Sequence, residues 1–225
     1  MTIPGKLQVD KNTGHVTGPA KITYNDPFPT HNGTPGGSGA MMGVVMHTEV
    51  GFEAGTQAEF NNASSSASAF FSIGVNGAIH QYGPVGKSWM AWAQMAGNHS
   101  WYSIEHEDKG DTHSPLTEAQ IAASAQLIEV LSRFAGFPLQ VTDSVDVKGY
   151  GTHVMGGAAW GGHTCPGPGP RAGQRAAIVA LAKEIRSGTP PPPPPPVTEL
   201  EGILVQLPAG GSRKVLSRDG GHTWQ

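Results

Sequence analysis

At 225 residues and 37% hydrophobic content, the chain is long enough for one domain with a sizeable core and short appendages. Only 14% of the residues are charged and the formal net charge is −3, which excludes the basic surface that nucleic-acid binding requires. We therefore expect no nucleic-acid partner. Nowhere do about 18 apolar residues run consecutively, so we expect no membrane span either.

The first part of the chain predicts an arm followed by a buried strand. Residues 1–38 are rich in Gly, Pro, Thr and Asn without an apolar period, which indicates an irregular N-terminal arm that is packed on the domain or partly mobile. Met41 to Met46 form an apolar run that is typical of a buried strand, and this run ends at His47. A histidine where a strand gives way to a loop is well placed for a functional site.

Two segments further along also predict strands. Phe70–Gln81 has the pattern of a β-hairpin, because apolar-rich stretches flank the turn dipeptide Asn76-Gly77. Trp101–Glu107 alternates as a strand does, which places Ile104 on one face and Glu105 on the other.

Two amphipathic helices are predicted on either side of a glycine-dense segment. The first has Ser114 as its expected N-cap and stops at Gly136, and the second covers about Pro170–Arg186 with Gly188 past its end. Strands mixed with helices predict an α/β fold with a mixed central β-sheet flanked by helices, over residues 39–188.

A proline run separates this domain from a short C-terminal segment. The seven prolines Pro190–Pro196 predict a stiff polyproline linker over residues 189–196. Residues 197–225 are too few for an independent core, although Ser217–Trp224 resembles an Asp-box turn motif. A minimal hairpin with a binding role, a segment ordered only in an oligomer and a disordered tail stay open as interpretations.

Histidine and cysteine supply the candidate metal ligands. Cys165 is the only cysteine, so it cannot form an internal disulfide, and ten histidines accompany it. Catalytic zinc is normally bound by three side chains from His, Cys and carboxylates, with a fourth position open to water. His47, His153 and Cys165 would provide such a set. Spacing alone leaves open that Cys165 is a small buried apolar residue and that the histidines are structural.

Four sequence blocks follow one another in the order of a known family. They are Gly43–Thr48, Asn98–Glu105, Gly151–His153 and His163–Gly167. Together they resemble the type 2 N-acetylmuramoyl-L-alanine amidase family, which is similar to the peptidoglycan recognition proteins and includes many phage endolysins. The resemblance covers residues 40–187, and the glycine-rich run 156–163 is similar to that of endolysins from phages that infect actinobacteria.

The resemblance implies a role for each matching residue. It implies that His47, His153 and Cys165 bind Zn2+, and that Glu105 is the general base and then the acid for the leaving amine. His163, two residues before the cysteine, occupies the place from which a lysine or threonine of the relatives often stabilises the oxyanion.

Two features modify this assignment. Glu107 lies two residues after Glu105 and is the second candidate for the base. Where some relatives have a tyrosine before the hairpin turn, this chain has Ala69 followed by Phe70 and Phe71, so no phenol assists from that strand. His163 would then contribute more to stabilising the oxyanion, as a charged or as a neutral donor.

Other side chains are predicted to line the substrate groove or the surface. We expect Trp92, Asn98 and Trp160 to contact the substrate, because aromatic walls suit sugar and peptide ligands. Four further histidines are expected on the surface: His80, His99, His106 and His113.

The resemblance implies a monomeric endolysin that hydrolyses the amide between N-acetylmuramic acid and L-alanine in bacterial peptidoglycan. Because the N-terminus has no apolar stretch of signal-peptide length, we expect the protein in the host cytoplasm until it is released onto the cell wall. Residues 197–225 would help the protein to bind the wall. Two alternatives stay open: a noncatalytic peptidoglycan-binding module, and a hydrolase with Cys165 as nucleophile. The second is disfavoured because Pro166 has no N–H with which to bind an oxyanion.

Overall fold

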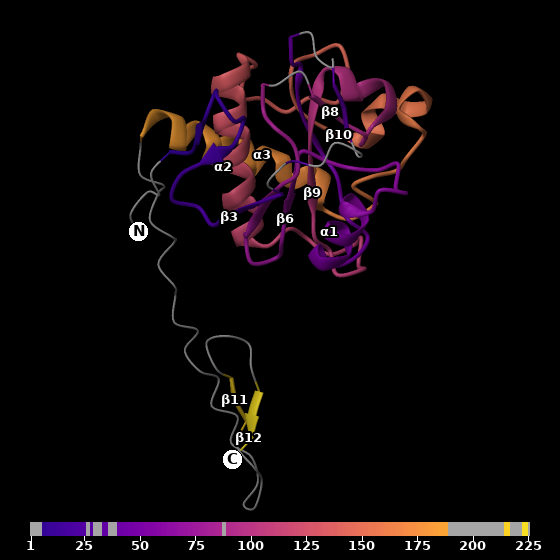
Figure 1. Ribbon diagram of the computed structural model, residues 1–225. Helices are drawn as coiled ribbons and strands as arrows, with labels where there is room; N and C mark the ends of the chain where they lie inside the picture. The colour runs from indigo at the N-terminus through magenta and orange to yellow at the C-terminus, as the bar shows by residue number, and fades with distance from the viewer. Residues whose placement is uncertain are drawn as a thin grey trace, which may run out of the picture. The chain divides into compact units, whose positions relative to one another are not determined.

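The computed structural model describes residues 6–25, 28, 33–35, 40–86, 89–188, 214–216 and 222–224. The chain divides into two compact units, residues 1–191 and 192–225. The first unit holds a central sheet and the helices α1, α2 and α3 (Figure 1).

The central sheet has six strands in the order β10-β5-β9-β6-β7-β3. These strands are β3 (Ile22–Tyr24), β5 (Gly43–Met46), β6 (Phe71–Ile73), β7 (Ile79–Gln81), β9 (Trp101–His106) and β10 (Gly149–Thr152). Only the β6–β7 hairpin pairs antiparallel, and the other four pairings in this sheet are parallel. The register pairs Met46 with both Ile104 and Thr152, so β5, β9 and β10 reach the same edge of the sheet.

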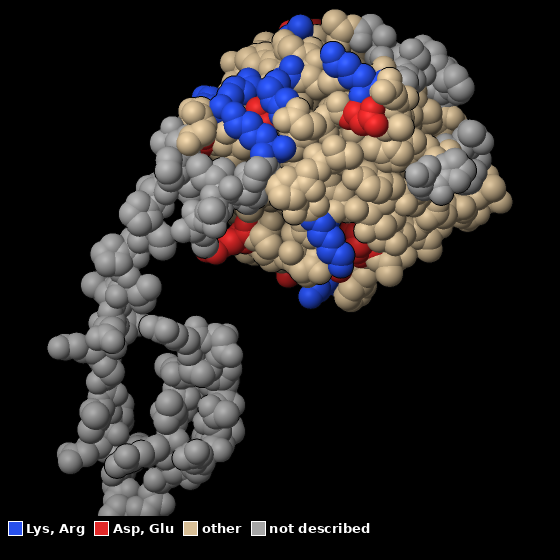
Figure 2. All heavy atoms as spheres, turned by 60° about the vertical axis from the view of Figure 1, so that its left-hand side comes forward, with Lys and Arg blue, Asp and Glu red and all other residues tan. Residues whose placement is uncertain are grey.

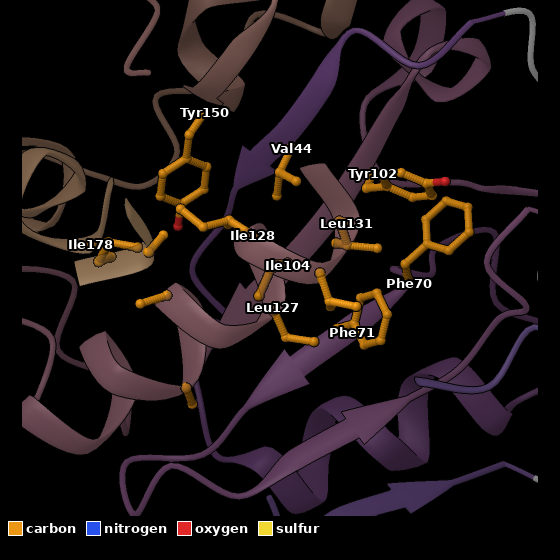
Figure 3. Packing of buried hydrophobic residues seen from close by; sticks show 14 of the residues in the cluster. Val44, Phe70, Phe71, Tyr102, Ile104, Leu127, Ile128, Leu131, Tyr150 and Ile178 are labelled. Atoms are coloured by element: carbon orange, nitrogen blue, oxygen red, sulfur yellow. The ribbon is translucent and has the colours of Figure 1, made fainter. Parts of the chain in front are cut away.

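Helices cover the sheet on both faces and confirm the predicted fold class. They are α1 (Glu53–Asn61), α2 (Glu118–Ala135) and α3 (Arg171–Ser187), with the 3-10 helices η1 (Met95–His99) and η2 (His153–Trp160). Helices α2 and α3 pack against each other (Figure 1). The apolar core lies between α2 and the sheet, and Figure 3 shows Ile104 and Phe71 together with Leu127 of α2. Helix α1 lies on the other face, where its Glu53 accepts a hydrogen bond from Ser72 of β6.

The N-terminal region is more regular than its sequence predicts. The expectation of an irregular arm is wrong at three short strands, β1 (Gln8–Val9), β2 (Val16–Thr17) and the sheet strand β3, while the residues between them are irregular. A buried side chain of the central sheet holds them: Gln81 accepts from Val16 N and donates to Gly14 O, each at 2.8 Å. Such pairing leaves no periodic pattern, because each of these strands has only two or three residues.

The other predicted elements appear with small shifts of their ends. Strand β5, the β6–β7 hairpin and β9 are confirmed, and α3 ends before Gly188 as predicted. Gly188 itself has the left-handed conformation. A separate two-stranded sheet pairs β4 (Gly33–Pro35) with β8 (Trp89–Ala91). Helix α1 has no counterpart among the predictions, since its only buried side chain is Phe60.

The predicted N-cap of α2 is wrong. The helix begins after Thr117, whose hydroxyl accepts from Gln120 N while the Gln120 side chain accepts from Thr117 N, forming a capping box. Ser114 instead donates to the carbonyl of Asp111 and accepts from buried Arg171. Both serine and threonine suit an N-cap, and tertiary contacts of Ser114 decide between them.

The second unit is described at two short strands. They are β11 (Lys214–Leu216) and β12 (His222–Trp224), which pair antiparallel. The linker prolines and the first part of the predicted Asp-box, residues 217–221, lie outside the described residues.

The surface agrees with the low content of charged residues. In Figure 2 most of the described surface is uncharged, and basic and acidic side chains lie near one another over it. Among the described residues, no helix has the length and apolarity that a membrane crossing requires.

We expect Thr117→Ala to lower the free energy of unfolding by about 1 kcal/mol, because Gln120 N loses its capping acceptor and the carbonyl of Val75 loses the hydroxyl that donates to it. Thr117→Ser keeps the hydroxyl and should stay close to the wild type. Urea unfolding of the two variants measures the difference. Equal midpoints for Ala and Ser at this position would show that the capping box contributes nothing.

Candidate metal centre

A row of polar side chains crosses one face of the sheet. The register pairs Thr23 with His80, His80 with Ser72, and Ser72 with Glu105. His47 follows Met46, the partner of Ile104, and so lies beside Glu105, with its Nδ1 3.8 Å from Glu105 Oε1. This row is opposite the apolar core, and it ends near the edge where β5 and β10 give way to loops.

His47, His153 and Cys165 come together at that edge. Their potential ligand atoms all lie within 4.8 Å of one another. Both histidines are buried, with 3% and 5% of their surfaces exposed, and their rings lie 4.7 Å apart. Burial lowers the pKa of both imidazoles, so they stay neutral at physiological pH, which is the form that binds a metal.

Hydrogen bonds fix which nitrogen of each histidine is available. Gln94 donates from Nε2 to the carbonyl of Trp101, so its Oε1 accepts from His47 Nε2 at 3.0 Å. His153 donates from Nε2 to the carbonyl of Trp160 at 2.8 Å. Both histidines therefore keep the unprotonated Nδ1 free, as expected for ligands whose other nitrogen has a fixed partner.

The cysteine sulfur accepts a backbone hydrogen bond and lies near charged side chains. Thr48, directly after His47, donates its backbone N–H to Cys165 Sγ at 3.2 Å. Burial raises the pKa of the thiol, and the nearby Glu105 carboxylate adds to this effect. Arg171, which is buried, donates to Thr48 Oγ1 and to the carbonyl of His106 behind the cysteine. A metal or another cation is what would favour the thiolate in this surrounding.

Glu105 is the candidate base and is nearly enclosed. Its side chain is 15% exposed, and its Oε2 has no hydrogen-bond partner among the described residues. Burial raises the pKa of Glu105 to about 8, with further contributions from the carboxylates of Asp108 and Glu53. A carboxyl group poised near neutrality is suited to proton transfer in both directions.

The two other predicted catalytic candidates differ in their surroundings. His163 is exposed and stacks on His153, with the ring centres 4.8 Å apart, so it lies at the open side of the cluster. Glu107 is buried, and its Oε2 accepts from Val75 N in the hairpin turn at 2.8 Å. Glu107 thus holds the turn in place, while Glu105 is the carboxylate beside His47.

The side chains predicted to contact substrate lie near the cluster in different ways. Asn98 Oδ1 accepts from the backbone N–H groups of Ala93 and Gln94, so it shapes the loop that positions Gln94. Trp160 is 4% exposed and packs edge-on against Trp101. Trp92 is half-buried. Substrate contact by these three residues stays a prediction.

Two histidines expected on the surface are buried, which corrects that expectation. His80 stacks on Tyr82 within the polar row. His106 donates from Nδ1 to the carbonyl of His47, and its Nε2 accepts from Ser124 of α2. Sequence alone gave no sign of these partners, because each comes from another part of the chain. His99 and His113 are exposed as expected.

A family comparison agrees with this geometry. The family model described as N-acetylmuramoyl-L-alanine amidase matches residues 38–168, more than half of the chain. The chain belongs to this family. The matched segment contains all three clustered ligands and Glu105. Comparison with curated proteins gives no significant match.

Solved structures with the same fold include a hydrolase and an N-acetylmuramoyl-L-alanine amidase. The hydrolase AmiA from Staphylococcus aureus, in complex with its ligand, is 17% identical, with 83% of this chain and 98% of that chain covered and a TM-score of 0.57. The N-acetylmuramoyl-L-alanine amidase LysC from Clostridium intestinale is 17% identical over 72% and 97%, with a TM-score of 0.51. A mutant of PlyL is 13% identical over 73% and 98%, with a TM-score of 0.52. These likenesses establish the amidase fold.

Burial of His106 predicts a pH-dependent stability. Burial lowers its pKa from 6.5 to about 4, so the unfolded chain takes up a proton at a higher pH than the folded protein does. Stability should therefore fall by about 3 kcal/mol from this group as the pH drops from about 6.5 to about 4.

The measurement is urea unfolding of the metal-free protein at a series of pH values. His106→Asn keeps a donor toward the His47 carbonyl and has no titration, so its stability should depend less on pH over that window. Parallel pH curves for the wild type and His106→Asn would show that His106 does not cause the loss.

Proposed function

We propose that the protein hydrolyses the amide between N-acetylmuramic acid and L-alanine in bacterial peptidoglycan, using Zn2+ bound by His47, His153 and Cys165. The observation that carries the proposal is the grouping of these three side chains, with Glu105 beside them, in a member of the amidase family.

The donor set fits zinc. Two imidazole nitrogens and one thiolate form a ligand set typical of this metal, and three protein ligands leave a fourth position for water or substrate. Both histidines present Nδ1, and the Thr48 N–H already points at the sulfur. When bound, zinc would supply a Lewis acid that polarises the scissile carbonyl and lowers the pKa of water.

Glu105 would act as the proton carrier. Its free Oε2 can accept a proton from the attacking water, and the carboxylic acid can then donate that proton to the leaving amine of alanine. Its neighbours favour this exchange, since Asp108 and Glu53 raise its affinity for the proton that it must hold between the two steps. His163, at the open side of the cluster, would donate to the oxyanion.

Structure and chemistry weigh against the alternatives. A noncatalytic binding module would have no use for three metal ligands with fixed orientations and an enclosed carboxylate. A cysteine nucleophile needs a thiolate, whereas burial and Glu105 raise the pKa of the Cys165 thiol.

The biological setting follows from the same resemblance. We infer a monomeric endolysin of a phage that infects actinobacteria, made in the host cytoplasm and acting on the wall after release. The glycine-rich run 156–163 and the shared fold with wall hydrolases support it. Residues 197–225 would add wall binding beyond the linker.

Release of stem peptides from purified cell walls tests the proposed function. We expect cleavage by the native protein, loss of cleavage with a chelator and recovery when Zn2+ is restored. Glu105→Gln should retain zinc and lose about 10²- to 10⁴-fold in kcat, because proton transfer is removed. Cys165→Ser should lose zinc. Cleavage that persists in chelator would overturn the metal-dependent mechanism, and wall binding without cleavage would favour the noncatalytic module.

The contact between Gln94 and His47 predicts a separate effect on metal affinity. Gln94→Leu removes the acceptor that fixes the His47 ring, so zinc affinity should fall about 10- to 100-fold. Competition with a chromophoric chelator measures the dissociation constant. Gln140→Leu is the control, since Gln140 also donates to a backbone carbonyl but contacts no ligand residue. Equal affinities for both variants would contradict the role of Gln94.

A further inference from the structure

Exposed apolar side chains lie close in the chain to residues of the candidate metal centre. Six large apolar side chains are exposed among the described residues: Val50, Phe52, Met95, Val141, Val147 and Val154. Four of them follow closely after residues of the centre in the chain: Val50 and Phe52 after His47, Met95 after Gln94, and Val154 after His153. We call these four side chains the apolar rim.

Two members of the apolar rim have an unfavourable backbone conformation. Val50 has φ 53° and Met95 has φ 45°, and Lys109, with φ 55°, is the other non-glycine residue in this region among the described residues. A left-handed backbone is costly for any side chain, and most of all for a β-branched one such as valine. Val50 and Met95 are 66% and 64% exposed, so packing within the protein gives little in return.

Hydrogen bonds hold both strained residues in place. Next to Val50, Gly51 N donates to Asp108 at 2.8 Å, and Gly51 O accepts from Lys109 N at 2.7 Å. Next to Met95, Gln94 N donates to Asn98 at 2.7 Å. The fold therefore presents these two apolar side chains to solvent in fixed positions, and strain of this kind concentrates where a ligand is bound.

Three members of the rim are linked to the groups assigned to the reaction, Met95 by its side chain and Val154 and Val50 through the backbone. A methyl group built on Gly161 would lie 3.1 Å from Met95 Sδ and 3.0 Å from the His163 ring, so both side chains border the same point. Val154 donates its N–H to the carbonyl of Cys165. The loop that carries Val50 begins at Thr48, the donor to the cysteine sulfur.

We propose that the apolar rim contacts the methyl-bearing groups on the two sides of the scissile amide, with Val50 and Met95 as specificity-determining residues. This rests on the proposed function, in which the cut amide joins a lactyl group and L-alanine, each with a methyl next to the amide. Apolar contact with one such methyl group is worth about tenfold in kcat/KM.

Glycine substitutions separate substrate contact from structure. Val50→Gly and Met95→Gly each remove the side chain and the backbone strain together, so neither should lower the thermal midpoint. Each should lower kcat/KM for a muramoyl-L-alanyl peptide by about tenfold. Val50→Ala keeps the strained backbone while shortening the side chain, and it should lose activity without a gain in stability. Zinc content of every variant is compared with that of the wild type.

Lys109→Gly is the matched control, because it relieves the same backbone strain and keeps the backbone N–H that donates to Gly51 O, while the Lys109 side chain is not part of the apolar rim. It should keep wild-type kcat/KM. A second readout compares muramoyl-L-alanyl with muramoyl-glycyl substrate: the wild type should prefer alanine, and Val50→Gly or Met95→Gly should lose most of that preference.

The outcomes separate this proposal from the proposed function. If the wild type cleaves the substrate and both rim variants keep its kcat/KM and its preference for alanine, the proposal for the apolar rim alone is overturned. An equal loss in Lys109→Gly would also overturn it, since the effect would then come from the backbone. A wild type that cleaves neither substrate in the presence of zinc would overturn the proposed function and the rim with it.

Discussion

The parallel register of β5 with β9 and β10 is the constraint on which the candidate centre depends. His47 leaves β5 where Glu105 lies in β9 and where β10 continues into His153, so three residues far apart in the chain meet at one sheet edge. Ligands of open α/β sheets gather at the carboxyl ends of the strands for the same reason. A shift of one residue in β5 would turn His47 toward the apolar core and separate it from both partners.

Orientation at this edge comes from hydrogen bonds rather than from the sheet. Gln94 and the carbonyl of Trp160 occupy Nε2 of the two histidines, and Thr48 N faces the sulfur. Each partner is itself held, since Gln94 donates to Trp101 and its backbone is bound by Asn98. Preorganisation of this kind spares the protein from ordering its ligands when a metal binds, and it excludes the wrong tautomers.

Sequence predicts the parts of this molecule that depend on neighbours along the chain. The apolar run before His47, the Asn76-Gly77 turn and the glycine after α3 each indicate an element by local chemistry, and the structure contains all three. Partners supplied by distant segments leave no such signal. Neither the burial of His106 against Ser124 nor the pairing of Gln94 with His47 could be read from spacing, because register and helix packing decide them.

The sheet also separates stability from chemistry. Side chains such as Ile104 point into the core beneath α2, whereas Glu105, the next residue, points to the polar face. Removing a ligand or the candidate base therefore leaves the apolar contacts with α2 intact, and such variants should fold. The polar face and the loop after β5 can then hold features that cost stability, among them the enclosed Glu105 carboxyl and the strained Val50, because the core on the other face supplies the free energy of folding.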